Sequence, residues 1–242
     1  MKIIDAHVHI GNNPTTKYYT LKEIKRDLRE AGAHGACLFA FPEDMYRMID
    51  SPTSRYAANE YVLKVSQNSK DFHPFYFVWN DFLIPENLSQ FHGIKWHRHS
   101  DEPRYDYTCP QCKEILERIT DLKLPVILEE EFGDTHRFIK ENSEITVIIP
   151  HMGQANGGYE KMTVFFEDSN VYFDTAVAPL EAIQFILDHV GPERIIFASD
   201  VSGTRMPFFN FPKIELQKLA KLNLDKESSR LIYAANIERI LP

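Results

Sequence analysis

Two histidines near the start of the chain are the first residues that could do chemistry. The sequence opens MKIIDAHVHI, in which His7 and His9 are separated by one residue within an apolar run. Alternate residues of a strand point to the same side, so we expect both imidazoles to project from one face. Two adjacent imidazoles either lie in a core with their hydrogen bonds satisfied or bind a divalent metal. What decides between these readings is which other residues the fold brings beside them.

The elements that position these residues alternate along the whole chain. Short runs rich in apolar and β-branched residues are separated by charged helical stretches, a pattern that predicts parallel strands with crossover helices. We expect strands at residues 2–7, 35–41, 72–79, 93–97, 125–129, 146–150, 171–175 and 194–199. We expect helices at residues 20–31, 54–67, 110–122, 134–142, 159–167, 179–189 and 211–220, and from 226 onward. This order favours an α/β fold, a single-domain (β/α)8 TIM barrel over residues 1–242.

Ionisable residues gather at the carboxyl ends of the expected strands. Lys95, His97, Glu129, His151 and Asp200 all lie at or just beyond such ends, whereas the strand interiors are rich in apolar residues. A TIM barrel carries its active site at the carboxyl ends of its strands. The clustering therefore indicates one functional site, and it favours metal binding by the two N-terminal histidines.

The composition excludes several classes of partner. The chain has 27 Lys and Arg against 35 Asp and Glu, a net charge of -8, which argues against nucleic-acid binding. No apolar run reaches the roughly 18 residues that a membrane span needs, and the N-terminus lacks the features of a signal peptide. Three cysteines are too few for a disulfide framework. We expect a cytoplasmic protein with a small-molecule substrate; homo-oligomer formation is left open.

Four segments together resemble the amidohydrolase superfamily. They are the D-A-H-V-H of Asp5–His9, the I-P-H-M-G of Ile149–Gly153, the I-I-F-A-S-D of Ile195–Asp200 and the N-I-E-R-I-L of Asn236–Leu241. Their order and spacing span nearly the whole chain. They most resemble the amidohydrolase 2 subgroup, which contains aminocarboxymuconate-semialdehyde decarboxylase. The resemblance implies a metal-dependent TIM-barrel enzyme.

One position departs from the subgroup. The fifth strand there ends in a metal-binding histidine, but this chain reads L-P-V-I-L-E over Leu124–Glu129. Carboxylates also ligate divalent ions, so the resemblance implies a metal held by His7, His9, Glu129 and Asp200. Zinc is the metal expected first. Two carboxylates favour harder ions than a histidine-rich site does, so manganese and iron are the alternatives. The competing interpretation is that Glu129 is a rim carboxylate paired with Lys95.

The resemblance also implies catalytic roles. A bound metal activates water, and Asp200 is expected to accept the proton of that water and pass it to the leaving group. His151 could bind a second metal, or polarise a substrate carbonyl and stabilise the oxyanion.

Cationic residues near the predicted mouth suggest an anionic substrate. Lys95 has three interpretations: contact with a substrate carboxylate, a structural ion pair, or a carbamylated bridge between two metals. Loop residues expected to face the same mouth are His97, Arg98, His99, Arg104 and Arg205. We assign substrate binding to Lys95, His97 and Arg205, against the alternative that each is a solvated charge.

A single C-x-x-C motif, Cys109-Pro110-Gln111-Cys112, follows the fourth strand. Without a second such pair it is weak evidence for zinc binding or redox work.

Three functions are consistent with these features. The first is hydrolysis of a C–N or C–O bond of a small anionic substrate by metal-activated water. The second is a lyase reaction, non-oxidative decarboxylation of an unsaturated or aromatic acid. The third is a metal-free lactonase or a binding barrel, which only the glutamate at position 129 supports.

Overall fold

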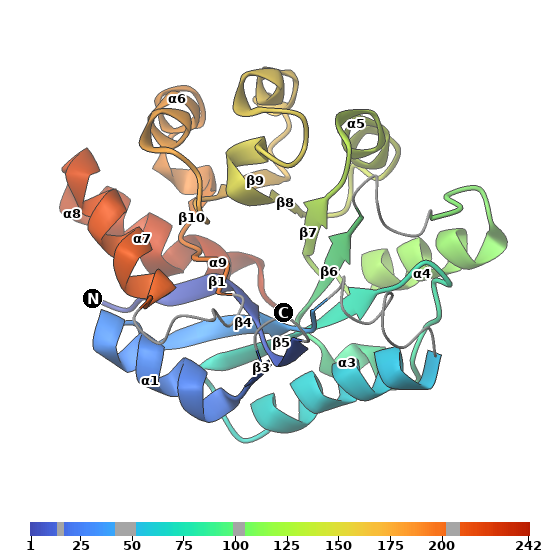
Figure 1. Ribbon diagram of the computed structural model, residues 1–242. Helices are drawn as coiled ribbons and strands as arrows, with labels where there is room; N and C mark the ends of the chain where they lie inside the picture. The colour runs from blue at the N-terminus through green and yellow to red at the C-terminus, as the bar shows by residue number, and fades with distance from the viewer. Residues whose placement is uncertain (14–16, 42–51, 99–104, 202–208) are drawn as a thin grey trace.

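Eight parallel strands form a nearly closed barrel, as the sequence predicted (Figure 1). The computed structural model describes residues 1–13, 17–41, 52–98, 105–201 and 209–242. The strands pair in chain order: β1 (Ile4–His9), β4 (Gly35–Phe39), β5 (Phe72–Val78), β6 (Gly93–His97), β7 (Val126–Glu129), β8 (Val147–Ile149), β9 (Val171–Asp174) and β10 (Ile195–Ile196). Backbone hydrogen bonds from Ala6 to Phe197 (3.0 Å) and from His9 to Val201 (2.9 Å) join the last strand segment to the first.

Helices surround the strands (Figure 1). The longer ones are α1 (Leu21–Ala31), α3 (Pro52–Ser66), α4 (Pro110–Asp121), α5 (Phe132–Glu141), α6 (Leu180–Val190) and α7 (Phe211–Leu219). The chain ends in α8 (Lys226–Arg230), a π-helical turn η6 (Leu231–Ala235) and α9 (Asn236–Ile240). Short 3₁₀ turns are η1 (Leu88–Gln90), η2 (Pro150–Gly153), η4 (Pro192–Arg194) and η5 (Ala220–Leu222). A capping box of Thr20 and Glu23 begins α1, and Gly32 ends it with a φ of 80°.

Two local predictions differ from the structure. The expected helix at 159–167 is a 3₁₀ segment, η3 (Tyr159–Phe165), whose buried residues Met162 and Phe165 are three apart, which matches the three-residue repeat of that helix. The expected strand at 194–199 pairs only over β10 because its next backbone N–H groups bond elsewhere: Phe197 to the Ile232 carbonyl (2.9 Å) and Ala198 to the Thr175 hydroxyl (3.1 Å).

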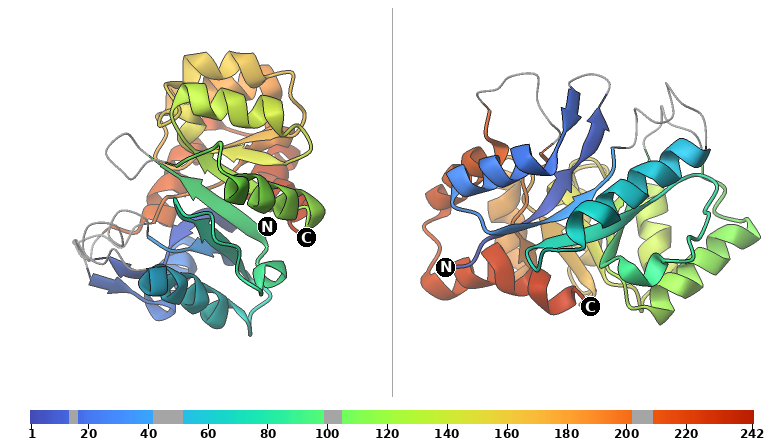
Figure 2. Two further views of the ribbon diagram at one scale, coloured as in Figure 1. Left: turned by 90° about the vertical axis from the view of Figure 1, so that its right-hand side faces the viewer. Right: turned by 90° about the horizontal axis from the view of Figure 1, so that it is seen from below.

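An antiparallel hairpin of β2 (Gly11–Asn13) and β3 (Lys17–Tyr19) follows β1 and was not predicted (Figure 2). Gly11 begins it with a φ of 115°, a backbone conformation that glycine adopts without steric cost. Among the described residues, no helix is both long and apolar enough to cross a membrane.

A bulge in β1 changes which residues of the strand face the barrel interior. The register jumps between Asp5 and Val8, so that residues 6 and 7 together oppose the single Cys37 of β4. Ala6 packs with Cys37 in a cluster drawn from strands around the whole ring, which is therefore the barrel interior. The His7 ring also faces inward, 5.0 Å from the ring centroid of Phe39 in the same cluster. Val8, in contrast, packs outward against α1 residues. The bulge thus lets apolar residues and the two histidines share the interior.

Candidate metal centre

Three histidines at the carboxyl ends of strands each have Nδ1 engaged by a fixed oxygen. The three distances are 2.9 Å from His7 Nδ1 to Asp174 Oδ2, 2.8 Å from His9 Nδ1 to the Ala40 carbonyl, and 3.0 Å from His151 Nδ1 to the Ala176 carbonyl. A carbonyl can only accept, so Nδ1 of His9 and of His151 donates; an ionised Asp174 imposes the same on His7. When neutral, a ring oriented in this way presents the lone pair of Nε2. Metal-binding histidines are commonly oriented in this way.

The Nε2 atoms converge with two carboxylates in two overlapping groups. Asp200 Oδ1 lies 3.5 Å from Nε2 of both His7 and His9. Glu129 Oε1 lies 3.6 Å from His151 Nε2. Among the described residues, the groups that could hold a metal ion are His7, His9 and Asp200, and His7, Glu129 and His151. The four predicted ligands therefore do not form one group: Asp200 lies with His7 and His9, Glu129 lies with His7 and His151, and His7 is common to both groups.

The electrostatics keep the candidate ligands in metal-binding protonation states. Burial lowers the pKa of His7 well below its ordinary value, and the Lys95 charge lowers it further, so the ring is neutral. Burial opposes ionisation of Asp200, but His7 and His9 outweigh it and lower its pKa to about 2. Burial also opposes ionisation of Glu129, but Lys95 and His97 hold its pKa well below the usual range. A neutral imidazole between two carboxylates is a donor set that fits a divalent ion.

His151 differs from the other two histidines. Burial disfavours its charged form, but its hydrogen bond and ion pair with Glu129 outweigh that effect and raise its pKa to about 9. Without a metal, therefore, His151 is a cation beside an ionised glutamate. It can ligate a metal only after losing that proton.

Lys95 is fully buried and occupies the centre of the site. Its Nζ donates to Glu129 Oε2 at 2.7 Å and lies 3.2 Å from His7 Nε2. The structure thus contains the ion pair with Glu129 that one interpretation predicted. The ammonium group also approaches the same His7 nitrogen that a metal would use.

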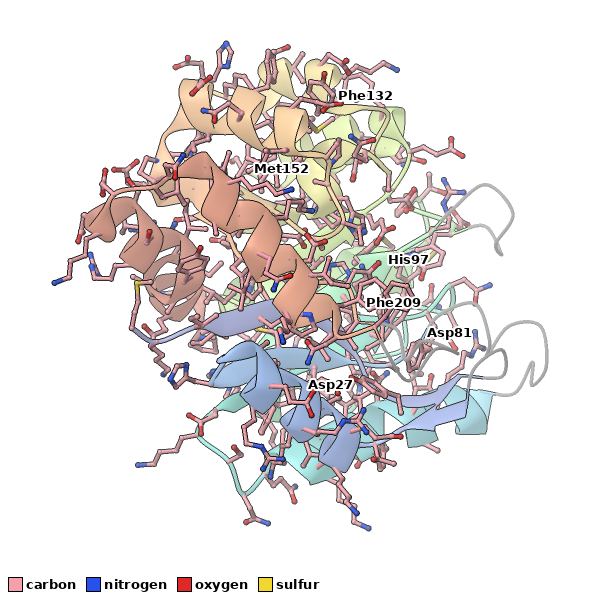
Figure 3. The ribbon with its side chains drawn as sticks, turned by 60° about the vertical axis from the view of Figure 1, so that its left-hand side comes forward. Asp27, Asp81, His97, Phe132, Met152 and Phe209 are labelled. Atoms are coloured by element: carbon pink, nitrogen blue, oxygen red, sulfur yellow. The ribbon has the colours of Figure 1, made fainter. Side chains whose placement is uncertain are left out.

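His97 ends β6 inside the site, with Nε2 3.5 Å from Glu129 Oε1. In Figure 3 the labelled His97 lies between Phe132 of α5, near the top of the view, and Asp27 of α1, below. The next residue, Arg98, forms ion pairs with Glu130 at 2.9 Å and Asp134 at 3.3 Å. The predicted loop residues His99, Arg104 and Arg205 lie outside the described residues.

Asp174 is a site residue that the sequence reasoning missed. It ends β9 and is completely buried. Its Oδ2 faces His7 Nδ1, while its Oδ1 accepts from the backbone N–H groups of His151 (2.8 Å) and Ala176 (3.1 Å). The signal was present, because an aspartate follows the apolar run Val171–Phe173 just as Asp200 follows another.

The backbone around the site adopts left-handed conformations without glycine. The φ angles are 56° at His151, 53° at Met152, 42° at Val177 and 56° at Asp200. Such angles are uncommon for residues with a side chain and are a marked outlier for a β-branched one. Their clustering at the ends of three neighbouring strands is typical of a functional site.

The comparisons with known families agree with this geometry. The family model described as amidohydrolase matches residues 4–242, so the chain belongs to the amidohydrolase family of enzymes. No curated protein matches the sequence.

Several solved structures share the fold. A probable 2-pyrone-4,6-dicarboxylic acid hydrolase from Acinetobacter baumannii superposes with a TM-score of 0.75 at 15% identity, covering 99% of both chains. A 5-carboxyvanillate decarboxylase from Sphingomonas paucimobilis has a TM-score of 0.74 at 12% identity, covering 99% of this chain and 98% of its own. A dihydroxybenzoic acid decarboxylase from Polaromonas sp. JS666, solved with manganese and 2-nitroresorcinol, has a TM-score of 0.72 at 14% identity, covering 99% and 96%. At these identities the likeness shows the fold alone.

Proposed function

We propose that this protein is a metal-dependent hydrolase that cleaves a C–N or C–O bond of a small anionic substrate. The observation that carries the proposal is the arrangement of His7, His9 and His151, whose Nδ1 atoms are engaged and whose Nε2 atoms meet Asp200 and Glu129. His7, His9, Glu129 and Asp200 would hold the ion, which when bound lowers the pKa of water toward neutrality. Two ionised carboxylates support manganese or iron as well as zinc.

The residues of the chain supply the proton chemistry. With its pKa lowered to about 2, Asp200 is ionised at neutral pH and can accept a proton at Oδ1. The same carboxyl group, once protonated, can return that proton to a leaving group, as a general acid does. His151, with a pKa raised to about 9, can donate a hydrogen bond from Nε2 to a substrate oxygen and stabilise developing negative charge there.

An anionic substrate is supported by the cationic groups of the site. Lys95 and His97 both face Glu129, and a substrate carboxylate could take over part of that partnership. We include Arg205 in the substrate-binding set from the sequence alone. The names of the similar structures, a pyrone dicarboxylic acid hydrolase and a carboxyvanillate decarboxylase, describe substrates that are carboxylic acids. The net charge of -8 argues against nucleic-acid partners. A cytoplasmic location remains a prediction from the sequence.

Decarboxylation is the second candidate, because several structures of the same fold are named as decarboxylases and one of them holds manganese. The two reactions are separated by their products. The metal-loaded protein is incubated with a lactone dicarboxylate such as 2-pyrone-4,6-dicarboxylate and with hydroxybenzoates, and both ring opening and carbon dioxide are measured. Ring opening that Asp200→Asn abolishes supports hydrolysis, whereas carbon dioxide release from a hydroxybenzoate would replace hydrolysis with the lyase reaction.

The role of Glu129 is tested by calorimetric metal titration. If Glu129 is a ligand, Glu129→Gln weakens binding because the amide loses the charge, and Glu129→His retains metal with a shift toward zinc. If Glu129 only neutralises Lys95, both variants bind as the wild type does. Lys95→Met is the matched partner variant, since it removes the ammonium that approaches His7 Nε2 and restores charge balance to Glu129→Gln.

A further inference from the structure

The C-x-x-C motif lies at the start of α4, on the outside of the barrel next to β6 (Figure 1). Cys109 is the N-cap of the helix, and its Sγ accepts a hydrogen bond from the Cys112 backbone N–H at 3.4 Å. All three cysteines, Cys109, Cys112 and Cys37, are free thiols in the structure. Neither of the described groups that could hold a metal ion contains Cys109 or Cys112.

Helix geometry holds these two side chains close together. Cα atoms three residues apart on an α-helix are about 5 Å apart, from a rise of about 1.5 Å and a radius of about 2.3 Å. That separation falls within the range of about 4.4 to 6.8 Å found across disulfides. The Cys109 Sγ lies 3.4 Å from the Cys112 backbone nitrogen, so it already faces the residue to which it would bond. A disulfide between the two residues is therefore compatible with the start of the helix.

The two thiols differ in exposure in the way that a redox pair requires. Cys109 is partly exposed, whereas Cys112 is 1% exposed and packs in the core with Ile115 and Ile119. Burial raises the pKa of the Cys112 thiol to about 12, so this thiol is protonated and does not itself attack an external disulfide. The exposed cysteine can meet an external disulfide, and the buried one can only meet its neighbour.

We propose that Cys109 and Cys112 form a redox-active dithiol, a modification site that external disulfides such as oxidised glutathione convert to an intramolecular disulfide. The Cys109 sulfur attacks one glutathione sulfur, the glutathione disulfide breaks, and one glutathione leaves as a thiol. The Cys112 sulfur then attacks the Cys109 sulfur of the mixed disulfide and gives its proton to the second departing glutathione. Two protein thiols are oxidised and one glutathione disulfide is reduced to two thiols.

The site is separate from the metal centre, so its chemistry is independent of the proposed hydrolase activity. Tyr105, in the segment that leads to α4, donates its hydroxyl to the His97 carbonyl at 3.1 Å and to the Val78 carbonyl at 2.7 Å. Neither of these two hydrogen bonds involves a cysteine. We therefore expect metal affinity to be the same in both forms.

The test uses the full chain equilibrated with a series of reduced and oxidised glutathione ratios in the presence of EDTA. Samples are acid-quenched, unfolded and alkylated with N-ethylmaleimide, and their intact masses are measured. The reduced protein should take up three maleimides and the oxidised protein one, at Cys37, with peptide mapping placing the disulfide between Cys109 and Cys112. Uptake of three maleimides at every ratio, a disulfide to Cys37, or an accumulated glutathione adduct would overturn the proposal.

Three variants keep the result interpretable. Cys112→Ala retains a small apolar residue in the core and should stop at a glutathione adduct on Cys109. Cys109→Ser retains a helix cap and should abolish the reaction, because the remaining thiol of the pair is buried. Cys37→Ala is the matched control, since Cys37 lies in the barrel interior on β4 and its removal should leave the reaction unchanged. A glutathione adduct on Cys112 in Cys109→Ser, formed at the glutathione ratios that oxidise the wild type, would refute the assignment of the attacking thiol.

Discussion

Replacing Asp174 with Asn should weaken metal binding although Asp174 touches no metal. Asp174 Oδ2 faces His7 Nδ1 at 2.9 Å, and its Oδ1 accepts from two backbone N–H groups. In Asp174→Asn the amide oxygen can keep those two backbone bonds, which leaves the NH₂ group facing the imidazole. An NH₂ group can only donate, so His7 must accept at Nδ1 and carry its proton on Nε2. A protonated Nε2 cannot bind a metal.

The size of the effect follows from other partners of metal-binding histidines. Their loss typically costs about 10- to 100-fold in metal affinity, which corresponds to about 1.4 to 2.8 kcal/mol. Titration calorimetry of the apo protein with Zn²⁺ or Mn²⁺ measures this loss. Nitrogen-15 NMR of the imidazoles reports the tautomer of His7 directly. That tautomer would not change in the variant if Asp174 had only a structural role.

The control is Asp27→Asn on α1. Asp27 is also a buried carboxylate, it accepts from the Tyr19 hydroxyl at 2.6 Å, and it belongs to neither described group that could hold a metal ion. The control should bind metal as the wild type does and keep the His7 tautomer. Wild-type affinity in Asp174→Asn, or an unchanged tautomer in that variant, would refute the reasoning.

Three further outcomes are expected. Metal at about 100 times its Kd should stabilise the protein by about 2.7 kcal/mol, and His9→Ala should remove this shift in Tm while the apo barrel remains folded; an equal shift in the variant means that the ion binds elsewhere. Burial lowers the pKa of His73 from 6.5 to about 4, so its contribution to stability is full above pH 6.5 and is lost as the pH falls toward 4. His73→Phe should therefore reduce the fall in the free energy of unfolding between pH 7 and pH 5, by at most about 2 kcal/mol in urea titrations. An unchanged fall in the variant would contradict the pKa shift. Val177→Gly should raise the free energy of unfolding by about 0.5 to 1 kcal/mol, because a φ of 42° is strained for valine and not for glycine; a lower midpoint in urea would show that the side chain matters more than the strain.

Much of the barrel could be predicted because its signals are local. Apolar runs and turn residues lie in short windows of sequence. The rule that sites occur at the carboxyl ends of strands then singled out His7, Glu129 and Asp200, which the structure places in two groups that share His7. The capping box at Thr20 was equally readable, since both its members lie within one helical turn.

The remainder depends on partners that are distant in the sequence. Asp174 reaches His7 across 167 residues, and no local pattern records that contact. Strand β10 is short because the Thr175 hydroxyl and the Ile232 carbonyl take its hydrogen bonds, which only the assembled barrel brings together. The second grouping of Glu129, with His151, depends likewise on how two neighbouring strands align.

The bulge in β1 has a consequence for any attempt to transplant this site. It shifts the inward–outward alternation of the strand by one residue: Ile4 and Ala6 point inward before the bulge, and His7 and His9 point inward after it. A regular strand with the same sequence would direct Val8 inward with Ala6 and turn both imidazoles toward the helices. Copying the D-A-H-V-H letters into another barrel would therefore transfer the residues without the site. The bulge has to be transferred as well, together with a partner strand in which one residue pairs opposite two residues of the bulged strand.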